Sequence, residues 1–173
     1  MRKLIYLLVL SVLVSGCASV QITRTGKEAF TKKLNSEDPV YIITPENGVY
    51  ENKEYTGSGK MTANFLVLAF SRYSKQVEKS EGVEVLEVGL AKAKDKGFMY
   101  LVSPQILKWE DRATEWSGIT DKVQVKVSLV DLSTGDIIDT VLIKGHSAWA
   151  TFGGDHPQDL LEKPINEYVA SLY

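Results

Sequence analysis

The sequence predicts an α+β fold, in which helices pack on one mixed, largely antiparallel sheet. Two observations lead to this class. Short β-branched or alternating apolar runs predict five strands, and three longer segments carry apolar residues at helical spacing. The predicted order of strand, helix, strand, helix, three strands and helix is typical of this class. The chain has 173 residues, 44% of them hydrophobic and 24% charged, so it can bury the core of one globular domain.

The first predicted strand and helix follow a polar N-terminal stretch. Residues 40–44 form a β-branched run, which predicts a strand. A helix is expected over 59–73, with Ser58 as its cap. The apolar run 65–70 predicts that this helix is well buried. One face of it is expected to carry Met61, Phe65, Leu68 and Arg72.

A second strand and helix are expected before the middle of the chain. Residues 73–79 alternate in a way that fits a short strand. Residues 83–96 predict a helix, because apolar residues recur on one face and three lysines lie near its end, where they suit the helix dipole. Gly97 is expected to terminate it.

The C-terminal half predicts three strands and a helix. The strands are expected over 98–109, with an interruption at Pro104, and over 123–131 and 137–149. Val123 to Leu129 alternates with polar residues, which predicts an antiparallel sheet with one solvated face. The last two strands are expected to form a hairpin through a glycine-containing turn. Residues 157–173 predict an amphipathic helix that is bent or broken near Pro164.

The N-terminus resembles a bacterial lipoprotein signal peptide. A short basic region precedes an apolar run that is too short to span a bilayer. The sequence Val14-Ser15-Gly16-Cys17 then resembles a lipobox, in which the cysteine thiol is diacylglycerated and the chain is then cut before that cysteine. The alternative is an ordinary signal peptide with an incidental cysteine. We therefore expect a signal peptide over 1–16, a tether over 17–38 and one domain over 39–173. Ala18, which is not Asp, implies export to the outer membrane by resemblance to enteric-type sorting rules.

Composition narrows the function classes. The net charge of −2 argues against a nucleic-acid partner. A single cysteine excludes an internal disulfide framework and a cysteine-rich zinc site, and two histidines leave little material for a histidine cluster. We expect no cofactor and no metal, and the sequence assigns no catalytic residue.

Two short motifs resemble catalytic signatures without matching them. Gly57 to Thr62 resembles a phosphate-binding loop, but Glu54 stands where its first glycine should be and Met61 where its hydroxyl should be. Gly145 to Trp149 resembles a nucleophile elbow, but Trp149 replaces the final glycine that permits the sharp turn. Both segments are interpreted as structural.

A polar cluster precedes the C-terminal helix. It consists of Asp155, His156 and Asp159. Residues three apart can share a helix face, so His156 and Asp159 could form two ligands of a metal site, and the cluster could also serve acid–base chemistry. The preferred interpretation is that Asp155 caps the helix, with Pro157 in its first turn.

A second unusual stretch, residues 109–118, joins two predicted strands. It carries Trp109, Glu110, Asp111, Arg112 and Trp116, a candidate surface for a partner or ligand. The alternative is that both tryptophan rings cover the edge of the core while Arg112 pairs with nearby carboxylates.

Three stretches together resemble a family of bacterial lipoproteins of unknown function. They are YENKEYTGSGKMTA (50–63), PQILKWEDRATEWSG (104–118) and WATFGGDHPQDLL (149–161). The resemblance covers residues 39–173 and implies no activity, cofactor or catalytic residue. The order of elements is also similar to the amino-terminal domain of the translocation protein TolB and to related outer-membrane lipoproteins, an analogy at the level of fold only.

These observations favour a non-enzymatic interaction or assembly protein. We expect it to be lipid-anchored at the outer membrane, to face the periplasm, and to bind an envelope protein or a glycan. The alternatives are a small envelope hydrolase that uses Asp155, His156 or Asp159, and a binding module for a glycan or another small ligand.

Overall fold

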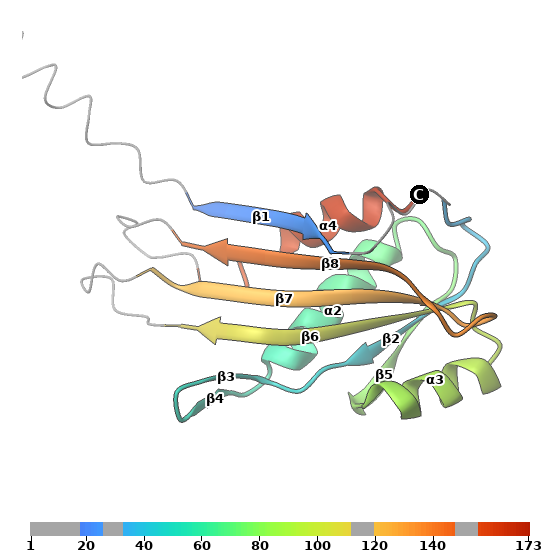
Figure 1. Cartoon of the computed structure of the whole chain (residues 1–173), viewed down its shortest axis with the longest axis horizontal. Coiled ribbons are helices and arrows are strands. Elements are labelled where there is room, and N and C mark those ends of the chain that lie inside the picture. The colour runs from blue at the N-terminus through green and yellow to red at the C-terminus, as the bar shows by residue number, and fades with distance from the viewer. Residues whose placement is uncertain (1–17, 26–32, 112–119, 148–155) are drawn as a thin grey trace, which may run out of the picture.

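The computed structural model describes residues 18–25, 33–111, 120–147 and 156–173. These residues form one six-stranded sheet, a small hairpin and three helices (Figure 1). The strands of the sheet are β1 (Ser19–Arg24), β2 (Val40–Thr44), β5 (Val77–Val83), β6 (Tyr100–Glu110), β7 (Lys122–Asp131) and β8 (Ile137–His146). The hairpin consists of β3 (Gly48–Tyr50) and β4 (Lys53–Tyr55), and the helices are α2 (Ser58–Phe70), α3 (Leu86–Asp95) and α4 (Glu162–Ala170).

The sheet is mixed and largely antiparallel, so the predicted fold class is confirmed. The strand order is β1-β8-β7-β6-β2-β5. Strand β2 runs parallel to both β5 and β6, and the remaining pairs are antiparallel. Parallel neighbours need a crossover, and α2 supplies it between β2 and β5.

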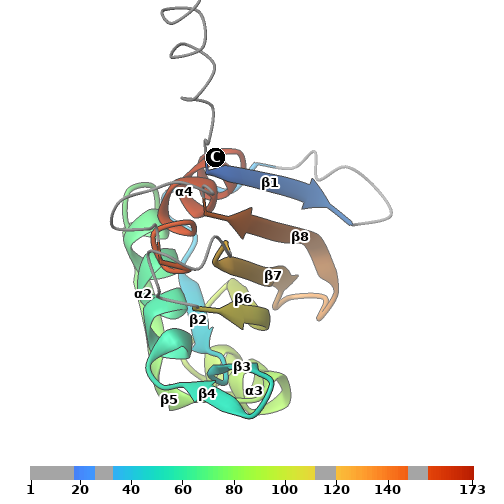
Figure 2. The same ribbon diagram turned by 90° about the vertical axis from the view of Figure 1, so that its left-hand side faces the viewer.

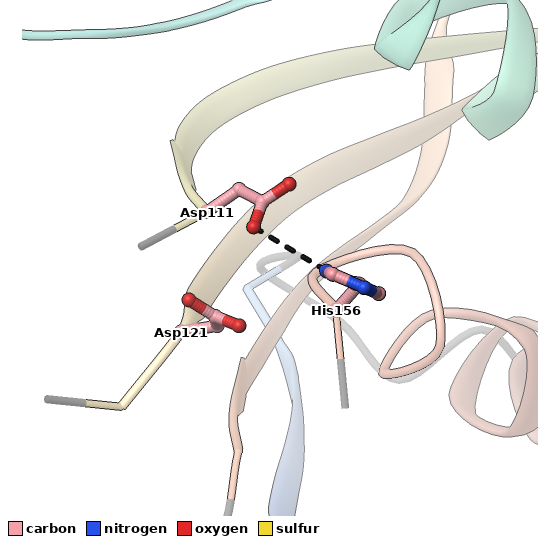
Figure 3. A group of neighbouring side chains, drawn as sticks. All are labelled: Asp111, Asp121 and His156. Atoms are coloured by element: carbon pink, nitrogen blue, oxygen red, sulfur yellow. Dashed lines mark hydrogen bonds and ion pairs between the residues drawn. The ribbon is translucent and has the colours of Figure 1, made fainter. Parts of the chain in front are cut away.

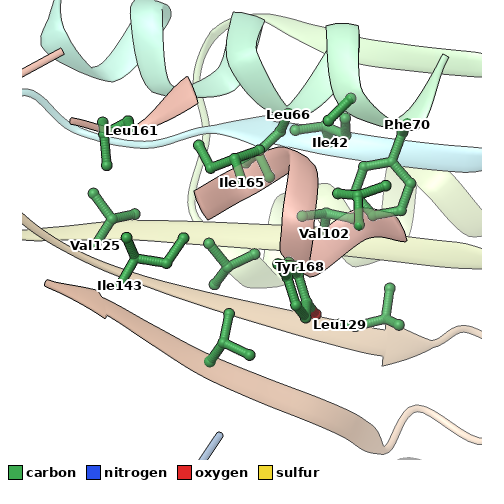
Figure 4. Close-up of a cluster of buried hydrophobic side chains, with 14 of the residues drawn as sticks. Ile42, Leu66, Phe70, Val102, Val125, Leu129, Ile143, Leu161, Ile165 and Tyr168 are labelled. Carbon is green, nitrogen blue, oxygen red and sulfur yellow. The ribbon is translucent and has the colours of Figure 1, made fainter. Parts of the chain in front are cut away.

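The main core lies between the sheet and the helices α2 and α4, which cover one of its faces (Figures 2 and 4). Phe70 of α2 and Ile165 of α4 are fully buried there against strand residues such as Val125. A smaller core lies on the opposite face, where α3 packs over β2 and β6. Successive β2 residues therefore alternate between the two cores, with Ile42 in the first and Tyr41 in the second.

The alternating strand predicted at 123–131 is confirmed as β7. Val123, Val125 and Val127 are fully buried, whereas Gln124 and Lys126 are half-buried on the other face. Helices cover only one side of this part of the sheet, which explains why the second face remains polar.

The start of α2 differs from the prediction. Gly57 is the N-cap, with φ of 90°, and Ser58 is the first helical residue. The capping acceptor comes from outside the helix, because Asn47 Oδ1 accepts hydrogen bonds from the backbone N–H groups of Gly57 and Gly59, each at 3.1 Å. Ser58 Oγ instead accepts the backbone N–H of Gly48 at 2.8 Å and so holds the β3–β4 hairpin.

Three further elements differ in position or orientation. The buried face of α2 includes Ala63, Leu66 and Phe70, whereas Leu68 is 61% exposed, because the apolar residues of this helix surround more than one face.

The strand expected at 73–79 forms at 77–83, where it pairs with β2. Residues 157–161 form turns before α4, and Pro164 lies within the first helical turn, where a missing N–H is tolerated.

Part of the segment predicted as a tether is a strand of the sheet. Residues 19–24 form β1, which pairs antiparallel with β8. Arg24 fixes its end: Nε lies 3.4 Å from Asp139 Oδ2, and Nη2 donates to Ser171 Oγ at 2.6 Å. Val20 and Ile22 alternate with polar residues in β1, but this apolar run is short and its side chains are mostly exposed on an edge strand.

Candidate functional site

One end of the sheet gathers segments that are distant in sequence. In the register of the sheet, Glu110 pairs with Lys122, Lys122 with His146, and His146 with Ser19. The end of β6, the start of β7, the end of β8 and the start of β1 therefore lie in one row across the sheet (Figure 1). We call this the cluster end of the sheet, after the side chains found there.

Asp111, Asp121 and His156 form a cluster at this end (Figure 3). Asp111 directly follows β6, Asp121 directly precedes β7, and His156 precedes the turns that lead into α4. One side-chain oxygen or nitrogen of each lies within 4.8 Å of the other two. His156 Nδ1 lies 3.4 Å from Asp111 Oδ1.

Backbone hydrogen bonds hold two members of the cluster without using the atoms that face it. The backbone N–H of Asp121 donates to Ser147 Oγ at 2.9 Å, and the backbone N–H of Ser147 donates to the carbonyl of Asp121 at 3.0 Å. The Tyr55 hydroxyl donates to the carbonyl of Asp111 at 3.1 Å. The carboxylate positions are thus set by β7, β8 and the β3–β4 hairpin.

His156 is held from its own segment. Its backbone N–H donates to Asp159 Oδ2 at 3.0 Å. The structure therefore brings together two residues of the predicted cluster, but Asp159 contacts the backbone of His156 and not its ring. Asp155, the predicted helix cap, lies outside the described residues.

The electrostatics of the cluster favour a positive charge. Asp121 is only 7% exposed, and its carboxylate lies close to that of Asp111. Two like unit charges about 5 Å apart repel by roughly 3 kcal/mol at an effective dielectric of about 20. A cation bound by both carboxylates would reduce this repulsion, and the imidazole of His156 lies within 4.8 Å of both. The arrangement is therefore suited to binding a cation.

Where the structure describes it, most of the stretch predicted as a partner surface is buried. Trp109 is 2% exposed and packs in the main core, and Glu110 is also 2% exposed and pairs with Lys108 at 2.5 Å. Trp109 lies on the core face of β6. The charged residues that follow it did not indicate this burial. Of this stretch, Asp111 joins the cluster. Arg112 and Trp116 lie outside the described residues, as does Cys17.

The two motifs that resembled catalytic signatures serve the fold in the described residues. Gly57 to Thr62 forms the start of α2. The His146 ring lies 3.4 Å from the backbone oxygen of Ser147, and its Nε2 lies 2.7 Å from Ser19 Oγ. A catalytic nucleophile instead requires the serine hydroxyl of the motif to contact the imidazole of the same motif.

Sequence reasoning missed Asp121, Tyr55 and Ser147. One signal was available for Asp121. Strands adjacent in sequence commonly pair as antiparallel neighbours, and such pairing puts the residue after one strand opposite the residue before the next. That rule brings Asp111 to Asp121, whereas Tyr55 and Ser147 enter only through the tertiary packing of the hairpin and β8.

The fold and the cluster define an open-sheet α+β domain with a polar site at one sheet end. The chain belongs to the family DUF4823, a domain of unknown function, whose model matches residues 32–172. No curated protein matches the sequence. In the described part of the chain, no helix combines the length and apolarity needed to cross a membrane.

The fold is shared with the protein PelC from Paraburkholderia phytofirmans. One dodecameric PelC structure, of a variant, superposes with a TM-score of 0.62 at 13% identity, covering 89% of this chain and 95% of that one. A second PelC dodecamer gives a TM-score of 0.59 at 14% identity, over 90% and 94% of the two chains. A lipoprotein from Neisseria meningitidis gives 0.40 at 13% identity, over 78% and 96%.

Proposed function

We propose that this chain is a lipid-anchored envelope protein that acts by binding rather than by catalysis. In this proposal Cys17 carries the lipid, the domain faces the periplasm at the outer membrane, and the partner is an envelope protein or a glycan. The lipobox-like sequence Val14 to Cys17 supports the anchor, because the single cysteine of the chain stands where acylation requires it. Several acyl chains on one N-terminus give stable membrane attachment, at about 0.8 kcal/mol per buried methylene.

The observation that carries the proposal is the position of β1. Ser19 pairs with His146 and is therefore part of the sheet. Two residues of extended chain span at most about 7 Å, so an anchor on Cys17 would hold the cluster end nearest the membrane. A strand this close to the anchor gives the domain a defined orientation, which a long flexible tether would not.

Two features of the described surface support a binding role. A hollow beside the cluster is lined by Asp111 and by the hairpin residues Tyr50 to Lys53 and Tyr55. The sheet is open, and its two edge strands, β1 and β5, present backbone groups to which a further strand could add. PelC, which shares the fold, is described as a dodecamer, and this supports self-assembly as one form that the binding takes.

Two substitutions test the anchor and its destination. Cys17→Ser should abolish labelling with a palmitate analogue and release the protein from membranes. Ala18→Asp should keep the label but move the protein from the outer to the inner membrane in an enteric-type host. The measurement is fractionation of envelopes followed by detection of label and protein. A Cys17→Ser protein that still takes up label would contradict the proposal, and so would one that still sediments with membranes in high salt.

A further inference from the structure

We propose that Asp111, Asp121 and His156 form a three-ligand site for a divalent transition-metal ion, and that zinc is the ion that fits best. This goes beyond the proposed lipid-anchored role and departs from the sequence expectation of no metal. That expectation considered His156 with Asp159, whereas the structure puts two carboxylates from other segments beside the imidazole.

The distance between His156 and Asp111 supports a shared ion. Hydrogen bonds from a ring N–H to an oxygen normally measure about 2.7–3.2 Å, and these two atoms lie 3.4 Å apart. Two ligands at about 2.05 Å from a tetrahedral zinc ion are separated by about 3.4 Å. The observed separation is therefore long for a direct hydrogen bond and right for two ligands of one ion. The Asp121 carboxylate lies within 4.8 Å of both, within reach of a small rotamer adjustment.

The ligand set indicates which ion. Magnesium and calcium prefer six or more oxygen ligands, and an imidazole is a poor substitute for one of them. One imidazole and two carboxylates suit zinc, which binds three protein ligands where a fourth position stays open for water or another group. The hollow lined by Tyr55 and Asp111 leaves access to that side of the cluster.

The local structure is organised for binding before an ion arrives. Asp121 is held by its paired hydrogen bonds to Ser147, Asp111 by Tyr55, and the backbone of His156 by Asp159. Each of these bonds ends on a backbone atom of the cluster residue, so the three segments are positioned through their backbones. An ion would therefore connect the end of β6, the start of β7 and the segment before α4 without rearranging their backbones.

The test is zinc binding by the complete protein purified in detergent. After treatment with a chelator and dialysis, titration calorimetry with zinc chloride should show one ion per chain. At a hundredfold excess of zinc over its Kd, the melting temperature should rise by about 5–10 °C. Binding should weaken as pH falls, because the imidazole and the carboxylates must be deprotonated to act as ligands.

Matched variants locate the ion. His156→Ala and Asp111→Asn should each weaken zinc binding by at least about tenfold and remove the thermal shift. His146→Ala is the control, because it removes the other described histidine, which lies on an exposed strand end and outside the cluster. Asp121→Asn should behave like Asp111→Asn, but Asp121 is buried, so circular dichroism must first show that this variant folds.

The outcomes separate cleanly from those of the anchor experiment. Zinc binding that is lost in His156→Ala and retained in His146→Ala supports the site. Failure of the wild-type protein to bind zinc, or binding of equal strength in wild type and His156→Ala, overturns it. Neither result changes whether Cys17 is acylated, because labelling and fractionation do not depend on the metal.

Discussion

Gly48 of the β3–β4 hairpin leaves no room for a side chain beside Trp109. A Cβ added at this position would lie 2.4 Å from Trp109 Cβ and 3.0 Å from Ile106 Cγ2. Trp109 itself is buried in the main core, so it cannot move outward without exposing its ring. Gly48 therefore allows the β3–β4 hairpin to lie against β6, where Tyr55 then reaches the carbonyl of Asp111.

Gly48→Ala should lower the free energy of unfolding by about 1–3 kcal/mol, the usual range for overpacking. Gly82→Ala is the matched control, since nothing lies within 4 Å of its added Cβ, and it should change stability by less than about 1 kcal/mol. Urea denaturation of the two variants measures the difference. Equal stability of the two variants would show that the hairpin does not pack on Trp109 as described.

Among individual residues, the sequence predicted only part of the site that the structure shows. His156 was identified from its polar neighbours in sequence, and Asp111 from the charged stretch around it. Trp109 and Glu110 were assigned to a surface because their neighbours are charged, but Trp109 lies on the core face of β6 and Glu110 is buried on the opposite face, where it pairs with Lys108. Asp121 has no distinguishing pattern of its own, and its role follows only from the register between β6 and β7.

At the scale of elements, β1 is the largest difference between prediction and structure. Only Val20 and Ile22 alternate with polar residues there, which is too short a run to stand out in a polar stretch, and an edge strand with exposed side chains does not need a longer one. What holds β1 is pairing with β8 and the contacts of Arg24 with Asp139 and Ser171. Asp139 is 2% exposed beside Tyr168, whose pKa is raised above its usual range by burial and then by the charge of Asp139.

Arg24→Ala should lower the free energy of unfolding by about 1–3 kcal/mol, because it leaves the buried Asp139 carboxylate without its cation. The estimate is below that for a fully buried pair, since the Arg24 side chain is 37% exposed. The measurement is urea denaturation with Arg72→Ala, an exposed arginine, as the control. Adding Asp139→Asn to Arg24→Ala should recover part of the loss, and a double variant no more stable than Arg24→Ala would contradict this explanation.

The central strands were predicted well because their pattern and their environment agree. Segment 123–131 alternates in sequence and is β7 in the structure, with one face in the core and the other half-exposed. The helices were located to within a few residues, but the buried face of α2 was not, since apolar residues surround that helix. Its cap also came from Asn47, which precedes the hairpin and gives no local signal at the helix start.

In the whole molecule, two features lie at the same end of one sheet. The first is Ser19, two residues after the proposed lipid attachment point. The second is the cluster of Asp111, Asp121 and His156. The turn between β7 and β8, which contains Ser133, lies at the opposite end of these two long strands. The α+β class and the family could be predicted from sequence, and the likeness to TolB stays a prediction. The position of Ser19 and the cluster at the same end of the sheet could not be predicted, because it depends on the pairing of β1 with β8.

The orientation of the acylated protein on a membrane tests the proposed anchor and the position of β1 most directly. A fluorophore attached at Lys122→Cys, next to the cluster, or at Ser133→Cys, in the distant turn, reports its distance from lipids that carry a quencher; both native positions are exposed. On liposomes, we expect strong quenching at position 122 and little at position 133, with none at either position when Cys17 is replaced by Ser. Equal quenching at both positions, stronger quenching at 133, or quenching that survives Cys17→Ser would contradict this expectation.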